Sequence, residues 1–289
     1  MKPAPFEYVD PRSVDEVVEQ LGRHGDEAKV LAGGQSLLPM LNLRLARPSL
    51  IVDLNRVAGL DTITEREGTL CVGALVRQRA LERWAIASAP LLATALRLVG
   101  HTAIRTRGTV AGSVAHADPS AELPALLLCL DGAVVARSRR GEREIAARDL
   151  FQGPLMTCLR PDEVVVQTRW RLPAQTDGWG LHEMARRHGD FALVGAVAVL
   201  TLARGVIARA RIALFGAGLV PLRAEASERV LVGQRPGSAV IEEAARAVVQ
   251  GLDPLSDLHA PAAYRLSVAR TLTSRALNDA LGRIKDAER

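Results

Sequence analysis

Apolar residues recur with a helical period near the N-terminus. In residues 13–25 the apolar positions are three or four apart, at Val14, Val17, Val18 and Leu21. This spacing predicts an amphipathic helix that begins after Ser13. Apolar runs at 28–34 and 49–54 predict two buried strands, and the segment between them, 36–45, has the pattern of a helix. The first third of the chain is therefore expected to form a small β-α-β-α-β unit.

Short strands around helices are expected from about residue 56 to residue 175. The sequence predicts, in order, a strand at 68–75, two helices within 80–100 separated near Pro90, a glycine-containing loop at 105–124, a helix through 125–130 and a hairpin within 133–148. Asp118 or Ser120 is the expected N-cap of the helix through 125–130. For Asp118, contact with a ligand is an equally good interpretation.

The last part of the chain is expected to combine an antiparallel sheet with helices. Strands are predicted within 181–187, 192–204 and 206–216, with a turn at Arg204–Gly205. Helical spacing of apolar residues then follows at 223–233, 238–250 and 262–281. The fold class is therefore α+β, with a C-terminal part that contains an antiparallel sheet and a helical bundle.

The charge distribution argues against a nucleic-acid partner. The 289 residues carry a formal charge of +5, but 37 basic residues are interleaved with 32 acidic ones, and only 3% of the residues are aromatic. The densest basic cluster, RSRRGERE at 137–144, lies between two apolar runs and is interpreted as a solvated hairpin turn in preference to a phosphate-binding patch.

The lengths of the apolar runs and the spacing of the cysteines indicate where the protein is located and which metal sites it lacks. No apolar run approaches the roughly 20 residues of a membrane span, and the N-terminus lacks the features of a signal peptide. Cys71, Cys129 and Cys158 are far apart, form no CxxC pair and have no histidine at metal-ligand spacing. We expect a cytoplasmic protein with reduced thiols, no membrane span, and no metal or iron–sulfur site in this chain.

Two glycine turns are candidates for binding phosphate. KVLAGGQS at 29–36 joins an expected strand to an expected helix, and TVAGS at 109–113 adds hydroxyl donors around a second glycine. A turn that leads into a helix concentrates unpaired N–H groups at the positive end of the helix dipole. Neither turn matches the GxGxxG or GxxxxGK[ST] pattern, so a nicotinamide Rossmann site and a P-loop are excluded. Taken singly, each turn is as well explained by a structural role.

The two turns lie within longer matches to one family. AGGQSLLPMLNLRLARP, residues 32–48, closely resembles the first FAD motif of the flavoprotein medium subunit of molybdenum hydroxylases, the family of xanthine dehydrogenase and carbon monoxide dehydrogenase. IRTRGTVAGSVAHADPSAELP, residues 104–124, resembles the second FAD motif. Further matches, in the family's order, occur at 185–195, 220–233 and 263–272. The resemblance spans nearly the whole chain.

The resemblance implies a two-lobed PCMH-type FAD-binding domain at 1–175, with lobes at about 1–55 and 56–175, and a CO dehydrogenase flavoprotein C-terminal-like domain at 176–289. The residues it implies for FAD binding are Lys29, Val30, Leu31, Ala32, Gly33, Gly34, Gln35, Ser36, Thr109, Val110, Ala111, Gly112, Ser113, His116 and Glu122. Two of these depart from the family pattern. Ala111 replaces a glycine, which puts the local loop geometry in question, and Glu122 replaces an aspartate.

The implied function is that of an electron-transfer subunit. FAD would take electrons from a small [2Fe–2S] subunit, supplied by a large molybdenum-cofactor subunit, and pass them to an external acceptor, in a dimer of heterotrimers. No residue is expected to be catalytic, because the flavin carries the chemistry. Two alternatives remain open: a self-sufficient FAD oxidoreductase of the same fold, and a flavin-less phosphate- or nucleotide-binding module.

Other polar residues carry less information. The remaining histidines, which show no spacing that indicates catalysis and are interpreted as structural or surface residues, are His24, His101, His182, His188 and His259. Arg186, Arg187 and Asp190 lie in a family-like segment, where contact with the flavin or a partner and a place on a surface strand edge are nearly equal interpretations. The sequence does not identify the substrate of the holoenzyme or its electron acceptor.

Overall fold

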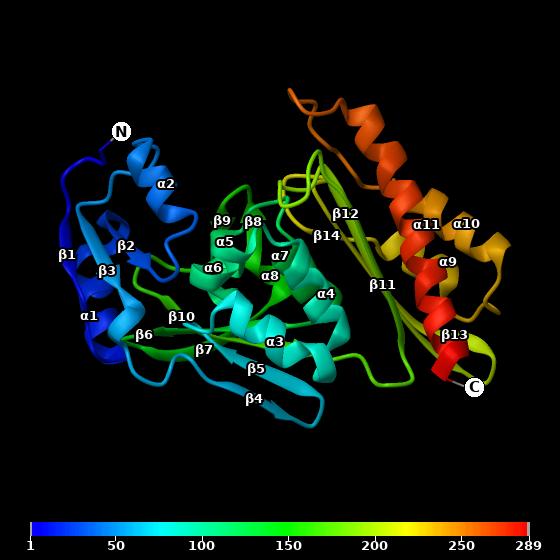
Figure 1. The fold of residues 1–289 in the computed structure, drawn as a ribbon, viewed down its shortest axis with the longest axis horizontal. Coiled ribbons are helices and arrows are strands. Elements are labelled where there is room, and N and C mark those ends of the chain that lie inside the picture. Colours follow the sequence, from blue (N-terminus) through cyan, green and yellow to red (C-terminus); the bar gives the residue numbers. More distant parts are fainter. Residues whose placement is uncertain (1, 288–289) are drawn as a thin grey trace.

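The N-terminal lobe is built on a short parallel sheet in the order β1-β3-β2 (Figure 1). It belongs to a computed structural model that describes residues 2–287. The elements of the lobe are β1 (Glu7–Val9), α1 (Val14–His24), the 3-10 helix η1 (Gly25–Glu27), β2 (Ala28–Leu31), α2 (Leu37–Asn42), β3 (Leu50–Asp53) and the 3-10 helix η2 (Leu54–Arg56). The helices and strands predicted for this lobe are confirmed.

Helix α1 begins at the predicted cap and buries the predicted apolar face. The Oγ atom of Ser13 accepts a hydrogen bond from the N–H of Glu16 at 3.2 Å, which caps the first turn. The apolar face then buries Val17, Val18 and Leu21. Ser36 occupies the predicted N-cap position of α2, but its side chain makes no capping hydrogen bond.

The second lobe surrounds an antiparallel sheet in the order β4-β5-β10-β6-β7. Its elements are β4 (Ile63–Arg66), β5 (Thr69–Gly73), α3 (Gln78–Ser88), α4 (Pro90–Leu98), α5 (Thr102–Arg107), α6 (Val110–His116), α7 (Glu122–Cys129), β6 (Ala133–Ser138), β7 (Gly141–Ala146), α8 (Ala147–Leu150), β8 (Phe151–Gly153), β9 (Met156–Thr157) and β10 (Val164–Arg171). The break between helices at Pro90 and the basic hairpin turn between β6 and β7 are confirmed.

Two predictions for this lobe were wrong. Residues 105–124 do not form one loop, because Thr109 caps a helix, α6, that follows α5 after a single turn. The N-cap of α7 is Ala121 and neither Asp118 nor Ser120. The carboxylate of Asp118 instead accepts from the N–H of Ser120 at 2.8 Å, closing a local turn before the helix begins.

The C-terminal part contains an antiparallel sheet in the order β11-β12-β13-β14. Its elements are β11 (Gly178–Met184), β12 (Val194–Ala203), β13 (Val206–Phe215), β14 (Leu222–Arg223), α9 (Glu225–Leu231), α10 (Ser238–Ala247) and α11 (Ala262–Ala287). The predicted turn is confirmed, with φ of +52° at Arg204 and +74° at Gly205, as the tight hairpin between β12 and β13 requires. The three predicted helical segments are also confirmed.

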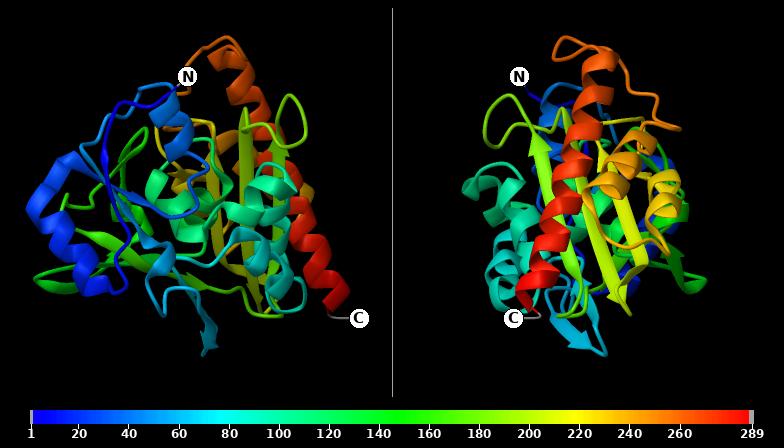
Figure 2. Two further views of the ribbon diagram at one scale, coloured as in Figure 1. Left: turned by 60° about the vertical axis from the view of Figure 1, so that its left-hand side comes forward. Right: turned by 90° about the vertical axis from the view of Figure 1, so that its right-hand side faces the viewer.

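The C-terminal sheet lies between two layers of helices (Figure 2). Helix α11 runs along one face, while α4 and α7 of the second lobe contact the other. The contact with α11 is close, because a Cβ on Gly178 would lie 1.9 Å from the carbonyl oxygen of Ala280. The sheet thus completes two cores, one with the second lobe and one with α9, α10 and α11.

The described residues contain neither a membrane-spanning helix nor a cluster of metal-binding side chains. Within residues 2–287, no helix has both the length and the apolar character needed to cross a membrane. Over the same residues, histidine, cysteine and carboxylate side chains do not gather in groups of three or more that could hold a metal ion. The cysteines Cys71, Cys129 and Cys158 are free thiols.

Candidate functional site

The chain turns sharply between β2 and α2, at Gly33 and Gly34. Gly34 has a φ of +74°, in the left-handed region that favours glycine. Gly33 is buried, and a Cβ there would lie 2.6 Å from the carbonyl oxygen of Arg107 and 2.7 Å from the Cα of Gly108. The two glycines are therefore needed for different reasons, and the first glycine turn lies directly against the second.

This first turn presents a run of N–H groups without acceptors. From Gly33 to Leu37, none of the backbone N–H groups donates a hydrogen bond to another group within residues 2–287. The carbonyl oxygens are used, since that of Gly33 accepts from Nε2 of Gln35 at 3.2 Å and that of Gly34 accepts from the N–H of Leu38 at 3.1 Å. Successive unpaired N–H groups in a turn form a concave site for an anion.

Thr109 shapes the second turn, between α5 and α6. Its Oγ1 accepts from the N–H of Gly112 at 3.1 Å and so caps α6. A Cβ at position 112 would lie 2.5 Å from this Oγ1, so the glycine leaves room for the cap. The N–H of Val110 donates to the carbonyl oxygen of Val76 at 3.1 Å, which holds the turn against the rest of the lobe.

Arg77 and Asn55 join the two turns. The guanidinium of Arg77 donates to the carbonyl oxygen of Arg107 at 2.7 Å and to Oδ1 of Asn55 at 2.5 Å. Asn55 in turn donates from Nδ2 to the carbonyl oxygen of Ala32 at 2.9 Å. Burial, and then the nearby charge of Arg107, lower the pKa of Arg77 from that of a free arginine. An excess of positive charge beside the turns favours an anionic ligand.

The predicted FAD-binding residues occupy different environments. Lys29 is exposed on the edge strand β2, and Val30, Leu31 and Ala32 are half-buried. Gly33, Gly34, Gln35 and Ser36 form the first turn, and Thr109, Gly112 and Ser113 lie at the second. The side chains of Val110 and Ala111 point into the core, with 0% and 2% of their surface exposed. These last two residues can contribute only backbone groups to a ligand.

Ala111 leaves the second turn intact. It lies in the first turn of α6, its φ is not positive, and its methyl group is part of the hydrophobic core. The helical backbone explains this tolerance, since a helical residue accepts a Cβ without strain. Ala111 therefore gives no support to the flavin-less alternative.

His116 and Glu122 lie farther along the chain, at the end of α6 and the start of α7. Burial lowers the pKa of His116, and the charge of Asp118 only partly opposes this effect, so the surroundings favour the neutral imidazole. Glu122 is 6% exposed. Burial raises its pKa to about 8, and the carboxylate of Glu183 adds to this effect.

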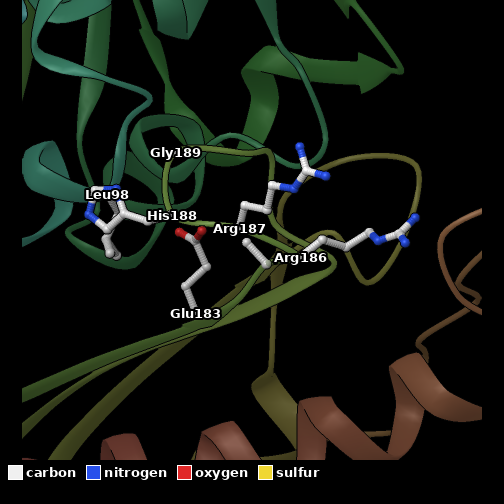
Figure 3. A pocket seen from close by; sticks show the side chains of 7 residues that line it. Leu98, Glu183, Arg186, Arg187, His188 and Gly189 are labelled. Carbon is white, nitrogen blue, oxygen red and sulfur yellow. The ribbon is translucent and has the colours of Figure 1, made fainter.

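A cavity of about 250 Å³ opens above the end of β11 (Figure 3). It is lined by Leu98, Glu183, Ala185, Arg186, Arg187, His188 and Gly189. In Figure 3 the carboxylate of Glu183 points toward the loop of His188 and Gly189, whereas Arg186 and Arg187 extend away from it. The cavity thus has an acidic floor and a basic rim.

The cavity and the glycine turns lie at opposite ends of α5. Gly189 packs on His101, the N-cap of α5. A Cβ on Gly189 would lie 2.7 Å from the imidazole ring of His101. At the other end, Arg107 and Gly108 contact Gly33. A six-residue helix is about 9 Å long. A ligand of dinucleotide length can therefore reach from the turns to the cavity.

Several residues at this site were not found from the sequence. Arg77 carries no local signal, because only the fold brings it to the two turns. Asn55 does carry a signal in the sequence, because it follows β3, the strand parallel to β2. Parallel strands present their carboxyl ends at one edge of a sheet, so Asn55 is expected near the turn that follows β2. Glu183 lies just before the family-like segment of Arg186, Arg187 and Asp190, and it belongs to no motif of its own.

Comparisons with known proteins identify the family of the chain. Residues 4–174 match the family described as FAD binding domain in molybdopterin dehydrogenase, and residues 179–280 match CO dehydrogenase flavoprotein C-terminal domain. A 6-hydroxypseudooxynicotine dehydrogenase complex subunit alpha from Paenarthrobacter nicotinovorans is 42% identical over 99% of this chain and 97% of its own length. A carbon monoxide dehydrogenase medium chain from Hydrogenophaga pseudoflava is 36% identical over 98% of this chain and 99% of its own.

Solved structures show the same likeness. A chain in the structure of a carbon monoxide dehydrogenase from Hydrogenophaga pseudoflava superposes with a TM-score of 0.95, at 38% identity, and covers 98% of this chain and 99% of that one. A chain of quinoline 2-oxidoreductase from Pseudomonas putida 86 gives a TM-score of 0.91 at 38% identity, over 98% of this chain and 100% of that one.

Proposed function

Because the chain belongs to the family of FAD-binding medium subunits of molybdenum hydroxylases, we propose that it transfers electrons through FAD from a [2Fe–2S] subunit to an external acceptor. The family establishes FAD as the cofactor and the chain as an oxidoreductase subunit. The direction of electron flow and the arrangement of the partners belong to the proposal.

The observation that carries the proposal is the run of unpaired N–H groups from Gly33 to Leu37, packed against the turn at Thr109. These backbone groups would hold the FAD diphosphate, and Arg77 would add positive charge beside it. Residues 109–113 would enclose the diphosphate from the other side, with Ser113 offering a hydroxyl donor. The successive N–H groups from Gly33 to Leu37, which have no acceptor within residues 2–287, suit a diphosphate, so the residues present fit the group.

The flavin end of the cofactor would lie toward the cavity. His116 and Glu122 would line the way from the second turn, and Glu183 would face the ring. When bound, FAD supplies reversible two-electron chemistry. The chain's own residues bind the diphosphate, orient the ring and set its electrostatic surroundings, and we assign none of them a catalytic role in the electron transfer itself.

Partner subunits are proposed from the relatives. Their names describe a complex subunit and a medium chain, which supports an assembly of several subunits. A large molybdenum-cofactor subunit and a small [2Fe–2S] subunit, arranged as a dimer of heterotrimers, are the partners of the proposal. The division into a FAD-binding domain at 1–175 and a C-terminal domain at 176–289 is part of the proposal, and the two family matches support it. We also propose a cytoplasmic location, in agreement with the free thiols.

Co-purification tests the electron-transfer role. The tagged chain, expressed in its native host, should retain FAD and bring down molybdenum- and iron-containing chains in fixed stoichiometry. Addition of the holoenzyme's substrate should then bleach the flavin absorption, and an acceptor should restore it. A yellow chain that purifies alone and oxidises a small molecule without partners would replace the proposal with the self-sufficient oxidoreductase.

A further inference from the structure

A buried ion pair between Glu82 and Arg105 joins α3 to α5. The two residues are 4% and 6% exposed. Nε of Arg105 donates to Oε2 of Glu82 at 3.0 Å, and Arg79 donates to the other carboxylate oxygen at 2.5 Å. Burial raises the pKa of Glu82, but the hydrogen bonds from Arg79 and Arg105 more than offset this effect and lower the pKa below that of a free glutamate, so the pair is charged.

The guanidinium of Arg105 also closes the C-terminal end of α4. Its Nη1 donates to the carbonyl oxygens of Val99 and Gly100, at 3.0 and 2.9 Å. The carbonyl groups at the end of a helix have no partner within the helix, and an arginine that binds them fixes the helix end. Leu98, the last residue of α4, lines the cavity beside Glu183 (Figure 3). Arg105 therefore holds one side of the cavity in place.

One turn of α3 connects this ion pair to the glycine turns. Gln78 and Glu82 are four residues apart and both buried, so they lie on the same face of the helix. The N–H of Gln78 donates to the carbonyl oxygen of Gly108 at 2.9 Å, which holds the second turn. Glu82 holds Arg105 and, through it, the end of α4. The separation between the turns and the cavity is therefore set by the rigid backbone of α3.

We propose that Arg105, held by Glu82, is a positioning residue that fixes the flavin end of the FAD site relative to the diphosphate end. This inference rests on the proposed function and deepens it. Both side chains are buried, so they act through α4 and α5 and not by contact with FAD. The N–H groups from Gly33 to Leu37 belong to another lobe and bind the diphosphate without help from the ion pair. The ion pair decides how well the cavity is aligned with the ring.

Binding of FAD and of ADP to the full chain after removal of FAD, measured by isothermal titration calorimetry, tests the inference. ADP carries the diphosphate but lacks the flavin, so it reports on the glycine turns alone. Glu82→Gln removes the charge that holds Arg105. Arg105→Lys keeps a cation but cannot bind the carboxylate and both carbonyl oxygens together. Each variant should bind FAD about tenfold more weakly, as expected for one lost charged hydrogen bond, and should bind ADP as the wild type does.

The bound flavin gives a second readout, and Glu163→Gln is the matched control. With FAD bound, flavin fluorescence in Glu82→Gln and Arg105→Lys should be quenched by iodide more readily than in the wild type, because the ring is held less firmly. Glu163 is also a buried glutamate, and it accepts from the side chain of Arg143 at 2.7 Å and from the N–H of Arg160 at 2.8 Å. These partners lie on β7 and in the loop before β10, so Glu163→Gln should lower stability and leave both affinities and the quenching unchanged.

The outcomes separate the inference from the proposed function. A wild-type chain that binds no FAD contradicts the proposed function, and the inference is then wrong as well. A wild-type chain that binds FAD but not ADP overturns the inference alone, as do affinities for FAD and ADP that fall together or both stay unchanged in the variants. If Glu82→Gln fails to fold, Arg105→Lys decides. Failure of both to fold, with Glu163→Gln folded, would assign the ion pair a purely structural role. A loss of affinity confined to FAD supports the positioning role.

Discussion

At the scale of single residues, Gly33 and Gly34 are adjacent but irreplaceable for different reasons. Gly34 has a positive φ, whereas Gly33 faces the backbone of Arg107 and Gly108. The sequence pattern showed only that two glycines interrupt two regular elements. The structure adds that one of them is where the lobes touch, so the pair both bends the chain and joins the turns.

Substitution of Gly34 tests the turn. Gly34→Val should cost about 1–2 kcal/mol of folding free energy through the left-handed backbone and should abolish FAD retention, because the N–H groups beside it would be displaced. Gly68→Val is the matched control: its φ is +72° against +74° at Gly34, it meets no neighbouring atom within 4 Å, and it lies in the β4–β5 turn. Chemical denaturation and flavin absorbance measure both effects. Equal FAD occupancy in the two variants would contradict the assigned site.

The pH dependence of the free energy of unfolding should report on the burial of Glu122. Its pKa is about 8 in the folded chain against 4.5 for an unperturbed glutamate. As pH rises from about 4.5 to 8, the unfolded chain loses this proton first, so ionisation favours unfolding by about 1.4 kcal/mol per pH unit. Glu122→Gln should therefore flatten the decline in the free energy of unfolding above pH 5. Denaturation midpoints at pH 5.5 and 8 measure it, and an unchanged slope would show that Glu122 is not buried as a neutral acid.

At the scale of elements, capping explains how the second turn keeps its shape. Thr109 is buried, caps α6 and stands between the helix and the first glycine turn. The glycine-containing loop expected from the sequence is helical because this cap starts a helix within it. Short helices of this kind owe their stability to tertiary packing more than to their own propensity.

Removing the cap should affect binding as well as stability. Thr109→Val keeps the shape and removes the acceptor of the Gly112 N–H, and it should cost about 1 kcal/mol and weaken FAD binding. Ser13→Ala removes the corresponding cap of α1, which accepts from Glu16 at 3.2 Å. It should cost a similar free energy and leave FAD affinity unchanged. Fluorescence titration of apo-protein with FAD distinguishes them, and equal affinities would assign Thr109 a purely structural role.

At the scale of the whole molecule, α7 links the two cores. Its Cys129 is fully buried against β12 and β13, where the thiol lies 3.5 Å from the carbonyl oxygen of Arg211. Just beyond the helix, Asp131 accepts from Arg223 at 2.7 Å and also pairs with Arg209. The second lobe and the C-terminal sheet are thus held by both apolar and ionic contacts.

Loss of the Asp131 carboxylate should loosen this connection. Within residues 2–287, Asp131→Asn leaves Arg209 without a charged partner and Arg223 with Glu228 alone, and it should cost about 2 kcal/mol. Differential scanning calorimetry should show a lower and broader transition, as the two cores begin to unfold separately. Glu225→Gln breaks an exposed pair with Arg229 and should have little effect. A sharp transition at the wild-type temperature in Asp131→Asn would show that apolar packing alone couples the cores.

The sequence by itself determined most elements and the place of the glycine turns. Helical and strand periods are local, so α1, β2, β3 and the β12–β13 hairpin followed from apolar spacing, caps and turn residues. The resemblance to a family supplied FAD and the two-lobed fold. The prediction of a loop at 105–124 was wrong because the hydroxyl of Thr109 caps a helix there. The prediction of a helix cap at Asp118 was wrong because its carboxylate closes a local turn before the helix begins.

Only the tertiary structure decided which distant residues meet. Arg77 bridges Asn55 and Arg107, and Glu122 shares its surroundings with Glu183, although these residues lie on separate elements. No local period encodes such contacts, because they depend on how sheets and helices pack. The same packing buries a carboxylate and raises its pKa, so the chemistry of the cavity follows from the fold and not from the motif.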